Sequence, residues 1–144
     1  MTSQLNVDTI VDKAGSGGTN VKVSNTSTYV SDGGAVTQNT VQSLGKAWAL
    51  LDGTGTIALQ DSFNIASVSD ESAGDYIFTV TNAFSSANFS CTANGRQSES
   101  PAWTAMTSSV GATAATTVRI TSRNTSNTAT DQKQLHTQFM GDLA

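Results

Sequence analysis

Hydrophobic and polar residues alternate with a period of two along most of the chain after residue 44. Such alternation is typical of β-strands that bury one face and expose the other. The clearest run is 76–81, in which Tyr76, Phe78 and Val80 share one face. Turn-forming residues separate the runs, and no stretch has the 3.6-residue period of an amphipathic helix. The predicted strands are 46–51, 56–60, 62–68, 76–81, 88–93, 102–106, 116–121 and 134–140.

Seven or eight strands in about 100 residues is the number expected for a β-sandwich or a jelly roll. We therefore predict an all-β, jelly-roll-like sandwich over residues 44–144, with a hairpin turn at Asn94-Gly95. The interior positions that the alternation predicts are Trp48, Leu50, Ile57, Phe63, Ile65, Tyr76, Phe78, Val80, Phe89, Cys91, Trp103, Val118, Ile120, Leu135 and Phe139.

A second apolar face follows from the same alternation, on the side of the strands that faces away from this interior. An apolar outer face on a single sandwich suggests contact between subunits. The residues that we assign to this face are Ala47, Ala49, Leu51, Ile77 and Met106.

Residues 1–43 differ from the rest of the chain, since they contain no Phe or Trp and their apolar residues are small and scattered. Such a segment cannot bury enough apolar surface to fold alone. We expect an extended N-terminal arm that docks on another protein through backbone pairing and apolar anchors. The candidate docking residues are Leu5, Val7, Ile10 and Val11.

Polar uncharged residues dominate the composition, with Thr 22, Ser 19, Asn 10 and Gln 8 among 144 residues. Leu, Ile, Val and Phe together number only 28, close to the ~20% level below which chains often fail to fold. A lone monomer with so thin a core would be marginally stable. We therefore expect an oligomer that buries further surface between chains.

The charge and the rare residues exclude several classes of function. Seven Lys and Arg against eleven Asp and Glu leave no basic surface for nucleic acid. The longest apolar run, 47–51, is too short to insert in a membrane. One Cys and one His cannot form an internal disulfide or a zinc site, and no cofactor is expected.

An ordered string of short motifs resembles the β-rich domain of bacteriophage tail-fibre and related virion proteins, especially those of phages of marine bacteria and cyanobacteria. The beginning of the chain and its ending at 139–144 are similar to the same proteins. The motifs are Leu5-Asn6-Val7-Asp8-Thr9-Ile10-Val11, Lys46-Ala47-Trp48, Asp52-Gly53-Thr54-Gly55-Thr56-Ile57-Ala58, Ser62-Phe63-Asn64-Ile65-Ala66-Ser67-Val68, Gly74-Asp75-Tyr76 and Phe139-Met140-Gly141-Asp142-Leu143-Ala144.

The resemblance implies a homotrimeric, non-enzymatic protein on the surface of a phage particle, on its tail or its head. We expect a tail-fibre-like appendage, attached to other virion proteins by its arm, whose sandwich binds a glycan or protein of the host surface. The alternative is a capsid decoration protein that stabilises the phage head. Aromatic and apolar candidates for receptor or subunit contact are Tyr29, Ile77, Trp103 and Met106.

The residues that could bind phosphate or a metal ion, or could catalyse a reaction, fit structural roles better. The Gly-rich turns 15–18 and 52–55 lack the Lys-Ser/Thr ending and the following helix of a phosphate-binding loop. Asp52, Asp70 and Asp75 lie in turn-like contexts, without the spacing of a calcium loop. Cleavage of host glycans, which needs two suitably spaced carboxyls, ranks behind both the host-binding and the capsid-decoration functions. We predict no catalytic and no metal-binding residues, and expect His136 to lie at the surface or at an interface.

Overall fold

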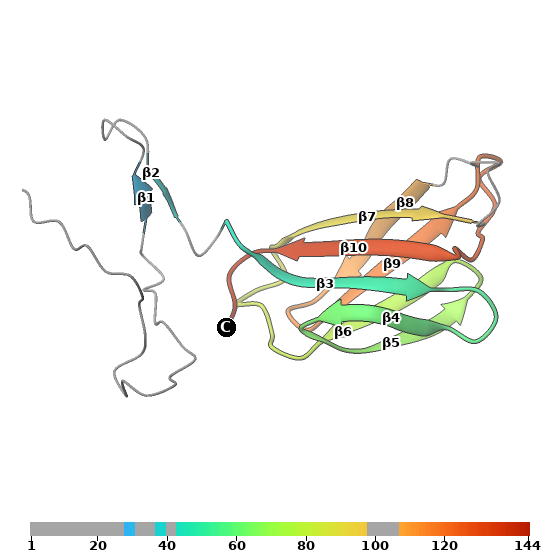
Figure 1. The fold of residues 1–144 in the computed structure, drawn as a ribbon, viewed down its shortest axis with the longest axis horizontal. Helices are drawn as coiled ribbons and strands as arrows, with labels where there is room; N and C mark the ends of the chain where they lie inside the picture. The colour runs from blue at the N-terminus through green and yellow to red at the C-terminus, as the bar shows by residue number, and fades with distance from the viewer. Residues whose placement is uncertain (1–27, 31–36, 40–42, 98–106) are drawn as a thin grey trace, which may run out of the picture. The chain divides into compact units, whose positions relative to one another are not determined.

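The computed structural model describes residues 28–30, 37–39, 43–97 and 107–144. The chain divides into two compact units, Met1–Val41 and Gln42–Ala144. In the first unit, β1 (Thr28–Val30) pairs in antiparallel fashion with β2 (Thr37–Asn39). The described part of the second unit contains strands β3 to β10 (Figure 1).

These strands form two antiparallel four-stranded sheets that make a β-sandwich-like arrangement (Figure 1). The first sheet has the order β4 (Ala58–Phe63), β3 (Gly45–Asp52), β10 (Gln134–Met140) and β7 (Ser90–Arg96). The second has the order β5 (Ile65–Ser72), β6 (Asp75–Val80), β9 (Thr117–Arg123) and β8 (Thr107–Thr113). The predicted all-β class is confirmed for the described residues. No helix capable of crossing a membrane is found among them.

The hydrophobic core lies between the two sheets and takes side chains from the inner strands of both. Aromatic rings fill much of it: Phe78 of β6 and Phe139 of β10 have ring centroids 6.3 Å apart. The predicted inward positions on β6, β9 and β10 are confirmed. The buried apolar residues are Ala47, Ala49, Leu51, Tyr76, Phe78, Val80, Phe84, Val118, Ile120, Leu135 and Phe139.

Strand β3 is turned the opposite way from the prediction. Trp48 is 40% exposed and Leu50 is half-buried, whereas Ala47, Ala49 and Leu51 are buried. The register explains this, because these three pair with Phe139, Thr137 and Leu135 of β10, which are also buried. Residues directly opposite in a sheet share a face. Small side chains on β3 leave room for the large rings from β6 and β10, so residue size is a poor guide to which face is buried.

The expectation for Phe63 is also wrong, since this side chain is 54% exposed. A bulge in β4 shifts the register between the Leu50–Asp61 pair and the Leu51–Leu59 pair. Leu59 therefore packs against the core while Phe63, four residues later, lies on the outside next to Trp48. Alternation along the sequence does not carry across such a bulge.

Asn64 divides the predicted strand 62–68 into β4 and β5. Its φ is 57°, a left-handed conformation that Asn tolerates better than most residues. The side chain joins β3 to the turn after β6: Nδ2 donates to the carbonyl oxygen of Lys46 at 3.0 Å, and Oδ1 accepts from the amide of Asn82 at 2.8 Å. An Asn between two strands thus marks a corner that the periodicity alone did not indicate.

The remaining expectations about the interior and the turns have mixed outcomes. Four residues predicted to be interior are only partly buried against the core: Ile57, Ile65, Phe89 and Cys91. A fifth, Trp103, lies outside the described residues. Asn94-Gly95 is not a turn, because both residues lie within β7 and pair with His136 and Leu135.

Position 95 is occupied by Gly because the buried side chain of Gln132 fills the space where a Cβ would lie. A Cβ on Gly95 would overlap the side-chain Oε1 of Gln132, which is fully buried. Strand β7 therefore needs a residue without a Cβ at the position where the Gln132 side chain packs against its backbone.

We predict that Gly95→Ala lowers the free energy of unfolding by about 1–3 kcal/mol, because the added methyl group displaces Gln132. Thermal unfolding measures this as a melting temperature lower by several degrees. Ser90→Ala, an exposed position of the same strand, is the control and should change stability by about 0.5 kcal/mol or less. The effects of Gly95→Ala and Gln132→Ala should be less than additive when combined; strict additivity would contradict the overlap.

Candidate functional site

The outward-facing side of the β4-β3-β10-β7 sheet, called here the outer face, carries a regular array of mixed side chains. The pairing registers place them in two rows that cross all four strands. From strand spacing and rise, each row spans about 14 Å and the rows lie about 7 Å apart. One row is Phe63, Trp48, Gln138 and Thr92, and the other is Asp61, Leu50, His136 and Asn94.

An open hollow of about 500 Å³ lies on this outer face. Its apolar part comes from Trp48 and Leu50, while amide, hydroxyl, imidazole and carboxylate groups supply the polar part. A mostly apolar hollow with a few converging polar groups is the usual form of a small-ligand site. The described residues that line it are Trp48, Ala49, Leu50, Asp61, Thr92, Ala93, Asn94, His136, Thr137 and Gln138.

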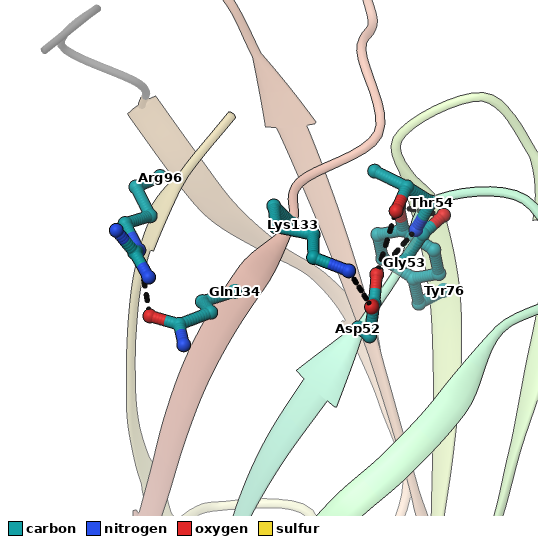
Figure 2. A network of polar contacts seen from close by, with 7 residues as sticks. All are labelled: Asp52, Gly53, Thr54, Tyr76, Arg96, Lys133 and Gln134. Atoms are coloured by element: carbon teal, nitrogen blue, oxygen red, sulfur yellow. Dashed lines mark hydrogen bonds and ion pairs between the residues drawn. The ribbon is translucent and has the colours of Figure 1, made fainter. Parts of the chain in front are cut away.

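Charged side chains beside the hollow are bound to partners, as Figure 2 shows. Lys133 donates from Nζ to Oδ2 of Asp52 at 2.5 Å. Arg96, which follows Asn94 on the same side of β7, donates from Nε to Oε1 of Gln134 at 2.6 Å. These contacts fix one end of the outer face.

The turn that follows β3 is built around the carboxylate of Asp52. Thr54 donates to Asp52 Oδ1 from its amide at 3.0 Å and from its hydroxyl at 2.7 Å. Together with Lys133, these hydrogen bonds lower the pKa of Asp52 to about 2. The Asp-Gly-Thr-Gly motif is therefore a structural turn, as its sequence context predicts.

The same end of the sandwich is closed by a partly buried polar cluster around Asp131. Its Oδ1 accepts from the amide of Gly74 at 2.7 Å and from the hydroxyl of Tyr76 at 3.0 Å. Burial and the nearby carboxylate raise the pKa of Tyr76. Gly53 lies directly on this hydroxyl, where a Cβ would overlap it, and its amide donates to the carbonyl oxygen of Gln132 at 2.8 Å. The cluster connects three loops to the core.

The two candidate site residues that the structure describes, Ile77 and Tyr29, are not among the described residues that line the hollow. Ile77 is half-buried on the outward side of the other sheet, opposite Arg119. Tyr29 lies in β1, paired with Gln38. Leu5, Val7, Ile10, Val11, Trp103 and Met106 lie outside the described residues.

The lining of the hollow was missed because the orientation of β3 was predicted wrongly. Once Trp48 and Leu50 are placed outward, the register brings His136 and Gln138 of β10 beside them. His136 is exposed, as predicted for the polar side of the last strand. The sequence signal that could have identified the site is the size difference between Ala47 and Ala49 on one face of the strand and Trp48 and Leu50 on the other. The face with small side chains is the one that can pack against large aromatic rings in the core, so Trp48 and Leu50 would have been placed outside.

No protein-family model matches this chain, and neither the curated proteins nor the solved structures contain a match to it. In the described part of the chain, no group of three or more His, Cys, Asp or Glu side chains is placed to hold a metal ion. The geometry of the outer face is therefore the main guide to function.

We predict that the ion pair of Asp52 makes stability depend on pH in the acid range. The pKa of Asp52 is about 2 in the folded chain and about 4 when unfolded. The unfolded chain then binds more protons between these values, so the stabilisation is complete above about pH 4 and is lost as the pH falls toward 2.

Urea unfolding of the parent chain and Asp52→Asn at pH 6, 4, 3 and 2 tests this. The difference in unfolding free energy should be largest at pH 6 and shrink toward pH 2. With Lys133→Met as the background, Asp52→Asn should show a weaker pH dependence, because the hydrogen bond from Lys133 that contributes most to lowering the pKa of Asp52 is removed. A difference that is constant from pH 6 to pH 2 would contradict the prediction.

Proposed function

We propose that this chain is a non-catalytic binding protein whose β-sandwich recognises its ligand with the outer face of the β4-β3-β10-β7 sheet. The observation that carries the proposal is the hollow around Trp48. A tryptophan that is 40% exposed in the middle of a sheet leaves a large apolar surface in water. Such side chains are common at the centre of binding sites, where they supply most of the affinity.

The biological setting that we propose is the surface of a phage particle. Following the resemblance to tail-fibre-like virion proteins, residues 1–43 would dock the chain on other virion proteins, and the sandwich would present its outer face to the host cell. Three copies in a jelly-roll-like homotrimer would convert weak single contacts into strong attachment. Pairing of strands distant in sequence, β3 with β10 and β6 with β9, supports a Greek-key type of connectivity.

The composition of the hollow favours binding over catalysis. Among the described lining residues Asp61 is the one carboxylate, whereas glycoside hydrolysis uses two carboxyl groups on either side of the bond. His136 and Asp61 lie in the same row with Leu50 between them, so two strand spacings, or about 10 Å, separate their backbones. This arrangement offers contacts to a ligand but no paired acid and base.

We predict that Trp48→Ala lowers binding of the full-length protein to cells of the bacterial host by about tenfold or more, because the largest apolar contact is lost. Flow cytometry with fluorescently labelled protein measures the change. Ser67→Ala, at an exposed position of β5 in the other sheet, is the control and should bind as the parent does. Equal melting temperatures of the variants show that the fold is kept.

Two results would overturn this proposal. Binding by Trp48→Ala at the level of the parent would remove the outer face from the site. A parent protein that does not bind cells and is present in hundreds of copies on the phage head would instead favour the capsid decoration function.

A further inference from the structure

We infer that the ligand of the outer face is an uncharged saccharide that stacks on the indole ring of Trp48. The inference rests on the proposed binding function and names the chemical class that this hollow fits. It follows from the shape of the apolar surface, the kind of polar groups around it, the distribution of charge and the position of the site within the sheet.

The apolar part of the hollow is centred on the inner strand β3. Trp48 lies between Phe63 on β4 and Gln138 on β10, and Leu50 follows it on the same strand. A pyranose ring presents a face of C–H groups that packs on a flat aromatic surface, while its hydroxyl groups point outward around the ring. An indole supplies that surface at a low cost in conformational entropy.

The polar side chains around Trp48 match a rim of hydroxyl groups. Asn94 and Gln138 each offer an amide that both donates and accepts, and Thr92 offers a hydroxyl that does the same. His136 adds the two nitrogens of its imidazole ring as hydrogen-bonding groups, and Asp61 adds carboxylate oxygens that accept hydrogen bonds. All five are exposed and project from strands of one sheet. Sugar hydroxyls also donate and accept, so this set can satisfy several of them at once.

The charge of the hollow disfavours anionic ligands. No Lys or Arg occurs among the described lining residues, and Asp61 is a carboxylate. Of the cations beside the hollow, Lys133 is paired with the carboxylate of Asp52, whereas Arg96 donates to the neutral amide of Gln134 and keeps its charge at the edge of the hollow, outside its lining. The whole chain has a formal net charge of −4 at pH 7. Acidic polysaccharides would therefore meet repulsion without a compensating cation in the hollow.

The position of the hollow also argues against an extended peptide. A peptide that adds to a sheet needs a free strand edge, where main-chain groups give the affinity. The floor of the hollow is formed by β3 and β10, which are inner strands paired on both sides. Affinity at this site must come from side chains, as it does for a sugar ring on an aromatic surface.

Affinity electrophoresis of the full-length protein in gels containing polysaccharide tests the inference. The probes are neutral polymers (dextran, galactomannan and xyloglucan) and acidic ones (alginate and polygalacturonate). We expect retardation by at least one neutral polymer, and dissociation constants at least tenfold weaker for the acidic ones. Trp48→Ala should abolish retardation and Trp48→Phe should keep most of it. Ser67→Ala, on the other sheet, should migrate as the parent does.

Fluorescence identifies the stacking residue directly. The chain has two tryptophans, so in Trp103→Phe the emission comes from Trp48 alone. Oligosaccharides of a bound neutral polymer should shift this emission and saturate at the affinity found in gels. Asp61→Asn should strengthen binding of the acidic polymers relative to the neutral ones, because the repelling carboxylate is removed.

The outcomes separate the two proposals. If no neutral polymer retards the protein, or if acidic polymers bind as tightly, the saccharide inference is overturned. If Trp48 is needed for binding to cells while none of these polysaccharides binds, the saccharide inference fails and the binding function still holds. If Trp48→Ala binds both cells and neutral polymers as the parent does, both proposals fail.

Discussion

The packing of small residues against large rings between the two sheets controls the rest of this structure. β3 occupies an inner position and faces the core with Ala47 and Ala49. The space that these alanines leave is available to Phe78 and Phe139, whose rings meet across the sandwich. Because adjacent residues of a strand point to opposite sides, burying the alanines forces Trp48 outward. Packing Ala47 and Ala49 against the aromatic rings thus both fills the core and places Trp48 at the hollow on the outer face.

The proposed site gains rigidity from this arrangement. Its side chains project from the paired strands β4, β3, β10 and β7 and not from loops. Directly beneath it lies the close-packed core, which resists deformation. At one end the Asp52–Lys133 pair and the Asp131 cluster fix the connecting loops. A preformed surface of this kind loses little conformational entropy when a ligand binds, which suits a protein that relies on a few modest contacts.

The homotrimer that we propose would both stabilise a thin core and strengthen binding at a weak single site. The described core contains eleven buried apolar residues, of which two are alanines, so it offers limited apolar surface for stability. An assembly of several chains adds buried surface and also presents several copies of the outer face together. When several identical sites bind together, the overall affinity depends on the spacing of the sites as much as on the strength of each single contact. The homotrimer on a particle surface that we propose would meet both needs.

The sequence by itself determined the class of the fold and the extent of several strands. Period-two alternation marked 134–140 without error, and it identified the buried sides of β6, β9 and β10, where large apolar residues alternate with polar ones. Alternation determines a period but not which side is inside, so β3, apolar on both sides, was oriented wrongly. The bulge in β4 and the role of Gly95 beneath Gln132 depend on neighbours distant in sequence. Only the tertiary structure decided them, and with them the residues that meet at Trp48, because the packing of one sheet against the other selects the face that each strand buries.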